Sequence, residues 1–269
     1  MIKSRGRLSI FLGAAIICFG CLIAVRAADG NNPAAPPHPF DYAKPALLTG
    51  TVYAIGSDHT NVLFNFRRSA TRTGNTVQVK RLFTSPDGRV AAIENVVYES
   101  GRLVSYGMTD PPAGVWGTVQ IVPDPDHPGL QKLLINHGHA GVAGENGVER
   151  NLPKDLLVDD TVYPFLLAHW SELAAGASVK FSMVSLERER AFAFVLRKTR
   201  ESVVEGKPVA WFKMAPASLI VAHFLNPIAL CVELDPPHRI LEYIGRTTPR
   251  IRKNGSWKFL DADTVFDWD

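Results

Sequence analysis

Apolar and polar positions alternate along much of the chain from about Leu47 to the C-terminus. Val77 and Val79, for example, are separated by Gln78, which is the period of a strand with one buried face. Segments with this pattern are also rich in β-branched and aromatic residues, as strands are. The pattern predicts strands in residues 47–56, 61–68, 76–85, 178–188, 190–200 and 209–215.

Turn sequences follow several of these segments. Residues 85–88 (SPDG), 100–101 (SG) and 254–255 (NG) place glycine where a tight turn needs a positive φ. Charged turns stand at residues 187–190 (ERER) and 205–207 (EGK). Since strands joined by short turns pair with their neighbours, the sequence predicts an antiparallel meander.

One amphipathic helix interrupts the strands. Asp159 or Asp160 can cap its start, Pro164 is tolerated in its first turn, and Gly176 is placed to end it. A second helix is predicted within residues 216–227. In the first helix, three large apolar residues recur at helical spacing and predict a stripe that packs on the sheet: Leu166, Trp170 and Leu173.

The N-terminus has the pattern of a secretory signal. Basic residues precede an apolar run from residue 8 to 25, and V-R-A at 25–27 supplies the small side chains that a signal peptidase accepts. We expect residues 1–27 to be a signal peptide cleaved before Ala28, which implies export to the periplasm. Two alternatives remain: acylation of Cys21, as in a lipoprotein, and retention of the apolar run as a membrane anchor. We expect membrane contact in those two cases only.

The rest of the chain divides into two parts. Residues 28–46 are rich in proline and small residues, which is typical of a linker, and residues 47–269 have the length of a single β-rich domain. Removing residues 1–27 discards four basic residues and no acidic one, so 25 basic residues face 26 acidic ones and the net charge changes from +3 to −1. This charge offers no support for binding to nucleic acid.

The segment LLINHGHAGVAGENGVE, residues 133–149, is the clearest candidate for metal chemistry. His137 and His139 are two residues apart, which puts both imidazoles on one face of an extended segment where a metal could bridge them. The distant candidates for a third ligand are Asp124, Asp126 and His127. Because two ligands do not make a site and glycines recur every third residue, we expect a mobile hairpin tip or rim without a metal, and no cofactor.

The sequence shows no motif for nucleophilic or acid–base catalysis. Ser218 lacks the flanking glycines of a nucleophile elbow, and Cys231 lies in an apolar run where a buried thiol is expected. The acid pairs at 159–160 and 261–263 stand where a helix cap and a C-terminal turn are predicted. We therefore predict no catalytic residues, which favours a protein that is not an enzyme without deciding the question.

Aromatic residues crowd the region of the first helix and two later strands. They are expected to form core, or alternatively to line a cavity for an apolar ligand. These residues are Trp170, Phe192, Phe194, Trp211 and Phe212.

A set of single residues between 150 and 250 carries a family resemblance. In order, the set consists of an aspartate-rich helix start, His169-Trp170, Leu173, Gly176, Val179, Phe181, Arg190, Phe194, Met214, Pro216, Ser218, Pro227 and Tyr243 to Gly245. It resembles a group of uncharacterised exported bacterial proteins that form a domain-of-unknown-function family. Those proteins are similar to half-open β-barrels of the lipoprotein-carrier type, which can enclose an apolar ligand. The resemblance implies a mainly β (α+β) fold, with a curved antiparallel sheet or half-open β-barrel and one or two packed helices.

Three functions fit these observations. The first is a non-enzymatic periplasmic envelope protein that binds or carries a lipid or another apolar ligand in a half-barrel. The second is a structural or assembly partner of an envelope protein, with no small ligand. The third is a metal-dependent hydrolase that uses His137 and His139. We favour the first.

Overall fold

The computed structural model describes residues 41–142, 144–150, 152–223 and 225–268. They belong to one compact unit. The expected signal peptide and residues 28–40 of the expected linker lie outside the described residues. In the part of the chain that is described, no helix has the length and apolar character needed to cross a membrane.

The described residues form one sheet of fifteen strands, in the order β8-β7-β6-β5-β4-β3-β2-β1-β15-β14-β13-β12-β11-β10-β9. The N-terminal strands are β1 (Leu47–Ala54), β2 (Val62–Thr73), β3 (Thr76–Thr84), β4 (Val90–Glu99), β5 (Arg102–Asp110), β6 (Val115–Pro123), β7 (Gln131–His139) and β8 (Glu145–Glu149). The later strands are β9 (Leu156–Leu157), β10 (Ser178–Ser185), β11 (Arg190–Val204), β12 (Lys207–Pro216), β13 (Ile228–Glu233), β14 (Ile240–Lys253) and β15 (Ser256–Asp267). The helical segments are η1 (Asp159–Thr161), α1 (Val162–Ala168), α2 (Trp170–Ala174) and α3 (Leu219–Ala222).

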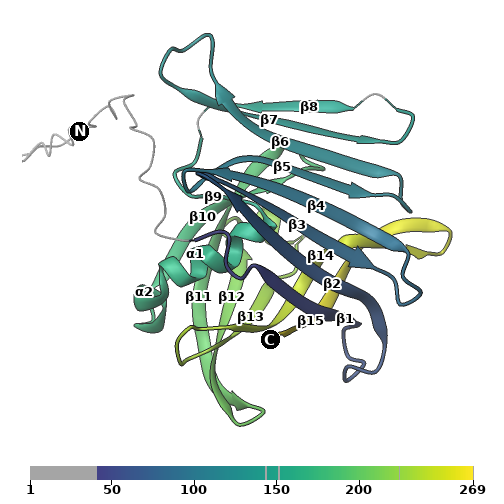
Figure 1. Cartoon of the computed structure of the whole chain (residues 1–269), viewed down its shortest axis with the longest axis vertical. Helices are drawn as coiled ribbons and strands as arrows, with labels where there is room; N and C mark the ends of the chain where they lie inside the picture. The colour runs from purple at the N-terminus through teal and green to yellow at the C-terminus, as the bar shows by residue number, and fades with distance from the viewer. Residues whose placement is uncertain (1–40, 143, 151, 224, 269) are drawn as a thin grey trace, which may run out of the picture. The chain divides into compact units, whose positions relative to one another are not determined.

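The first and last strands meet in the middle of the sheet. Val52 of β1 lies opposite Phe64 of β2 on one side and opposite Thr264 of β15 on the other. Two antiparallel meanders, β1–β8 and β10–β15, are thereby joined along one seam (Figure 1). β9 differs, since it pairs parallel to β10. The predicted fold class is confirmed: a mainly β protein with an antiparallel sheet and packed helices.

The sheet curls until β8, at one edge, contacts β11 and the β10–β11 turn near the other edge. The backbone N–H of Ala191, in β11, donates a hydrogen bond to Oε1 of Glu149 in β8 at 2.9 Å. Gly147 packs so tightly on the β10–β11 turn that a Cβ at this position would lie 2.2 Å from the carbonyl oxygen of Glu189. A side chain at residue 147 would therefore push these two parts of the sheet apart.

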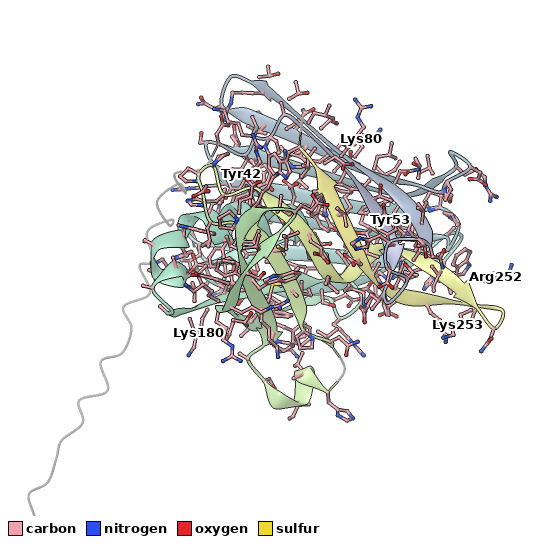
Figure 2. The ribbon with its side chains drawn as sticks, turned by 90° about the horizontal axis from the view of Figure 1, so that it is seen from below. Tyr42, Tyr53, Lys80, Lys180, Arg252 and Lys253 are labelled. Carbon is pink, nitrogen blue, oxygen red and sulfur yellow. The ribbon has the colours of Figure 1, made fainter. Side chains whose placement is uncertain are left out.

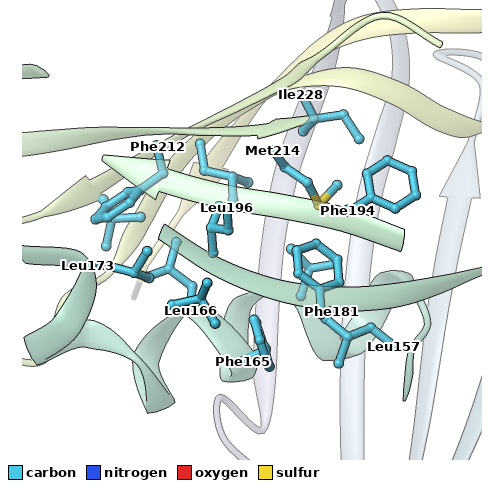
Figure 3. Close-up of a cluster of buried hydrophobic side chains, with 14 of the residues drawn as sticks. Leu157, Phe165, Leu166, Leu173, Phe181, Phe194, Leu196, Phe212, Met214 and Ile228 are labelled. Carbon is cyan, nitrogen blue, oxygen red and sulfur yellow. The ribbon is translucent and has the colours of Figure 1, made fainter. Parts of the chain in front are cut away.

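Three clusters of buried apolar side chains fill the inner face of the sheet. The first joins the helices to β10–β14, and Leu166 and Leu173 are completely buried in it (Figure 3). The second lies on β3–β7 and the third along the seam of β1, β2 and β15. Leu157 belongs to the first cluster and its neighbour Val158 to the second, so the segment before η1 joins the cores of the two meanders. Each large side chain buried in this way contributes about 1.5–3 kcal/mol.

The predicted first helix is present but interrupted. His169, with φ −101° and ψ 17°, separates α1 from α2, and Gly176, at φ +89°, follows the end of α2 as predicted. The capping role predicted for Asp159 or Asp160 is wrong, because Val158 occupies the N-cap position of η1. Both aspartates lie within η1 and interact with charged residues of the sheet instead.

The second predicted helix is much shorter than expected. β12 extends to Pro216, which pairs with Phe194 of β11, and α3 covers only Leu219–Ala222. The predicted turns are confirmed, since each of the five connects two consecutive strands. One of them closes the β14–β15 hairpin, whose end, marked by Arg252 and Lys253, projects from the rest of the sheet (Figure 2).

Trp170 anchors α2 on the sheet, as its place in the apolar stripe predicts. Its ring stacks on His238 at a centroid distance of 3.9 Å and lies 5.5 Å from Phe212. We expect Trp170→Ala to lower the free energy of unfolding by about 2–3 kcal/mol, which is less than for a fully buried aromatic residue because part of the ring is exposed. Urea denaturation measures this loss. Trp257→Ala, which removes an exposed indole from β15, is the control and should change stability by less than about 0.5 kcal/mol. Equal losses in the two variants would contradict the anchoring role.

Candidate functional site

The curled sheet surrounds a cavity of about 960 Å³ that is partly open to solvent. Its apolar wall comes from both meanders and includes Met108, Met183, Leu186, Phe192, Phe194 and Ile228. Its polar end is formed by Asp159, Tyr243, Arg246, Thr247 and Thr248. An apolar concavity with a few convergent polar groups is the usual form of a small-molecule site, so we take this cavity as the candidate functional site.

A second, smaller cavity of about 90 Å³ lies beyond the polar end. The same five polar-end residues line it, together with apolar residues of the seam such as Leu48, Phe66 and Phe266. The polar end therefore stands between the two spaces.

An irregularity in β14 determines where some side chains of this polar end lie. Between Thr247 and Ile251, β14 advances four residues while its partner β15 advances two, so β14 bulges out of the regular ladder. Such a bulge redirects side chains. The hydroxyl of Thr248 here donates a hydrogen bond to Oε1 of Glu94, a residue of β4 that is completely buried. The bulge thus bridges the interior from one meander to the other.

Arg250, two residues after Thr248, makes further contacts from β14 to other parts of the sheet. Its backbone N–H donates to Oδ2 of Asp110 at the end of β5 at 2.9 Å, and its Nη2 donates to Oε1 of Glu187 in the β10–β11 turn at 2.8 Å. The Arg250 side chain is only 8% exposed. Three separate parts of the sheet are therefore held around the cavity by one strand.

Asp160 is fixed on the inner face by Arg68 of β2. Arg68 donates from Nε to Oδ1 at 2.7 Å and from Nη2 to Oδ2 at 3.1 Å, and the hydroxyl of Tyr98 donates to Oδ2 at 2.9 Å. Burial alone would raise the pKa of Asp160, but the charge and hydrogen bonds of Arg68 outweigh burial and hold this pKa below its usual value. Asp160 therefore stays ionised and serves as an anchor for η1 and α1.

Asp159 has a different environment from its neighbour. Its side chain is 39% exposed and lines both cavities. Although part of the side chain is accessible, the surrounding protein displaces much of the water around the carboxyl group, and this desolvation, followed by the negative charge of Glu94, raises its pKa to about 7. Arg81 offsets this only in part, because it is paired with Glu94 and its Nη1 lies 4.0 Å from Oδ2 of Asp159. The cavity thus has a carboxyl group that changes charge near neutral pH.

Two of the five aromatic residues predicted as possible cavity lining do line it. Phe192 and Phe194 form part of the apolar wall. Phe212 is buried in the first core cluster, where Trp170 packs against it. Trp211 points to the opposite face of β12 from Phe212, and its Nε1 donates to Oγ of Ser202 at 3.1 Å.

Other lining residues were missed by sequence reasoning. Met183 pairs with Phe192 across β10 and β11, so the alternation of the two strands contained the signal for it. Met108 of β5 and Arg246 of β14 come from distant parts of the chain, and no local pattern marks them.

The two histidines of residues 137–139 lie in a strand and not in the predicted loop. His137 and His139 belong to β7, paired with β6, and the turn that follows them forms the hairpin tip. Their rings share one face, as the spacing predicts, with centroids 5.9 Å apart. Within the described ranges, no third candidate ligand gathers with them. Of the distant candidates, His127 is hydrogen-bonded to Asp124 at 2.9 Å.

The glycines of this hairpin permit close packing. A Cβ at Gly138 or at Gly144 would lie 2.7 Å from the indole of Trp116. The prediction of a mobile loop is therefore wrong for residues 133–139 and 145–149, which lie in the paired strands β7 and β8.

The predicted C-terminal turn at 261–263 is also wrong, because both aspartates lie in β15. Oδ1 of Asp261 accepts from Nε of Arg246 at 2.7 Å, and its Oδ2 accepts from Nδ2 of Asn226 at 2.7 Å. These bonds hold an arginine of the polar end and the segment that leads into β13.

Comparison with known proteins finds a likeness among solved structures. No family model matches the chain, and no curated protein matches it. Among solved structures, the chain is similar to a β-barrel-like protein of Domain of Unknown Function DUF1849 from Brucella abortus, at 8% sequence identity and a TM-score of 0.37. The match covers 83% of this chain and 97% of the other. A likeness to a barrel-like domain of unknown function, expected from residues 150–250, is thus found.

The raised pKa of Asp159 predicts a pH-dependent stability. A carboxyl group whose pKa rises from 3.8 to about 7 on folding favours the folded state below pH 3.8, and this contribution is lost as the pH rises through 7. Asp159→Asn keeps a neutral side chain at every pH. We therefore expect the variant to gain melting temperature relative to the wild type as the pH rises from 4 to 8.

Thermal melts at each pH measure this difference. Asp235→Asn, at an exposed turn position, is the matched control and should follow the wild type. Parallel melting curves for wild type and Asp159→Asn across the whole range would show that Asp159 does not titrate near neutral pH.

Proposed function

We propose that this protein is an exported, non-enzymatic envelope protein that binds an amphipathic lipid in its interior cavity. The observation that carries the proposal is the cavity of about 960 Å³, apolar over most of its wall and polar at one end. Its volume is at the upper end of the range for small-molecule sites, about 300–1,000 Å³. Export rests on the N-terminal signal pattern of the sequence.

The apolar wall suits an acyl chain. Met183, Phe192 and Phe194 come from neighbouring strands and offer a continuous surface of methionine and aromatic side chains. Methionine adapts its shape to irregular apolar partners, which favours a flexible chain as the ligand. Burial of such a chain is favourable at roughly 25 cal/mol per Å² of apolar surface.

The rim of the cavity offers a route of entry. Ile220 in α3 is 77% exposed and Phe259 in β15 is 50% exposed, yet both also line the cavity. Apolar side chains that face both solvent and cavity are suited to receive an apolar ligand from outside. Because α3 has only four residues, it can shift at a lower energetic cost than the strands.

The polar end suits a head group that is neutral or zwitterionic. Its arginine is already paired within the protein, since Nε of Arg246 donates to Asp261 at 2.7 Å. The cavity is also lined by the carboxyl groups of Asp159 and Glu187 and by the cationic Arg188, so its charged lining contains both signs, as a zwitterionic head group does. Thr247 and Thr248 supply hydroxyl groups for hydrogen bonds.

A substitution that fills the cavity tests this proposal. Met183→Trp adds volume to the wall, so we expect it to weaken binding of a fluorescent diacylglycerol analogue at least ten-fold, which corresponds to about 1.4 kcal/mol. Fluorescence titration measures the dissociation constant. Ala193→Trp places the same indole at an exposed position on the other face of β11 and should bind like the wild type.

The outcomes separate the candidate functions. Binding by the wild type and by Ala193→Trp, with loss in Met183→Trp, supports a lipid site in the cavity. Equal binding by all three proteins would place the probe elsewhere and contradict the proposal. Absence of binding by the wild type would favour an assembly partner without a small ligand.

A further inference from the structure

A cluster of three potential metal ligands lies away from the cavity. His59 comes from the loop between β1 and β2, Glu242 from β14 and Asp263 from β15. One ligand atom from each residue lies within 4.8 Å of the others, and Nε2 of His59 is 2.9 Å from Oδ2 of Asp263. We infer that these three side chains bind a divalent transition-metal ion.

The cluster is on the outer face of the sheet. Adjacent residues of a strand point to opposite faces. Tyr243 and Thr264, the neighbours of Glu242 and Asp263, line the interior cavities, so the two carboxylates point outward. The inferred site is therefore separate from the proposed lipid site, and its test does not depend on that proposal.

One carboxylate oxygen of the cluster is left without a partner in the described part of the chain. Oδ1 of Asp263 is buried and has no hydrogen-bond partner within the described residues. The ligand atoms of Glu242 and Asp263 lie within 4.8 Å of one another, so two carboxyl groups face the same space. A bound cation would occupy the space between the carboxylates and satisfy the unpartnered oxygen.

The position of the imidazole is well defined. His59 has a positive φ of 58°, in a loop closed by hydrogen bonds from Thr60 Oγ1 to the carbonyl of Ser57 at 2.6 Å and from Ala54 N–H to the carbonyl of Asn61 at 3.0 Å. The ring of Tyr53 packs on that of His59 at 4.9 Å. Tyr53 itself lies at the surface of the sheet on β1 (Figure 2).

The ligand types indicate the class of metal. One imidazole and two carboxylates suit zinc, manganese or iron in the divalent state, whereas copper(I) prefers sulfur ligands. Three protein ligands leave positions for water, and the His59 side chain is 48% exposed, so an ion can reach the site. The ion would link the β1–β2 loop to β14 and β15, directly beside the seam where the two meanders join. Its effect would be to reinforce that seam.

Zinc binding to the purified, EDTA-treated protein tests the inference. We expect calorimetry to show one zinc ion per chain and the melting temperature to rise by about 5 °C or more at zinc concentrations 100-fold above the dissociation constant. Asp263→Asn and His59→Asn should each weaken binding at least ten-fold. Asparagine is chosen at residue 59 because it tolerates positive φ. Melts in EDTA show whether each variant folds.

Two controls make the test specific. His127→Asn alters another histidine paired with an aspartate at 2.9 Å, but one that belongs to no three-ligand group in the described part of the chain. His137→Ala with His139→Ala removes the histidine pair of β7. Both proteins should retain zinc. Absence of stoichiometric zinc in the wild type, loss of zinc in either control, or unchanged binding in His59→Asn would overturn the inference.

Discussion

The buried ion pair between Arg68 and Asp160 fixes the connection between the two meanders. Arg68 is 5% exposed and Asp160 6% exposed, so neither charge is stabilised by bulk water. Burial of both charges is tolerable because their hydrogen-bonding groups are satisfied: Arg68 also donates to the carbonyl of Tyr42 at 2.8 Å, and Tyr98 donates to Asp160. Loss of either partner would leave an isolated buried charge, which typically costs about 3–5 kcal/mol.

The position of this ion pair determines what the interior can hold. Because Asp160 is tied to β2, α1 must begin on the inner face, and Asp159 must lie at the border of the two cavities. The β14 bulge approaches the same region and binds Glu94 through Thr248. These polar connections span the interior between the meanders, where apolar side chains alone would pack together and fill the space. The cavity follows from a polar framework inside a curled sheet.

Much of the fold could be predicted from local patterns. Alternation located six of the strands, turn residues located five of the connections, and Gly176 was placed correctly after the helix, because each depends on neighbours in sequence. The roles of Asp159 and Asp160 could not be predicted, since their partners Arg68 and Glu94 lie far away along the chain. The need for glycine at residues 138 and 144 could not be predicted either, because it comes from contact with the indole of Trp116 on another strand.

The candidate site could be predicted only in part, and for a physical reason. Phe192 and Phe194 share one face of β11 and do line the cavity. Trp211 and Phe212 are adjacent on β12, so they had to point to opposite faces, and alternation alone excluded a shared cavity. The polar end depends on a bulge in β14 and on contacts between strands distant in sequence, neither of which leaves a local signal.

Native mass spectrometry of the protein purified from its own host tests most directly whether the cavity holds a lipid. We expect a fraction of the protein to carry an additional mass in the range of a membrane lipid, released as a neutral or zwitterionic species on activation. A bare protein mass under gentle conditions that preserve known lipid complexes would contradict the proposed function.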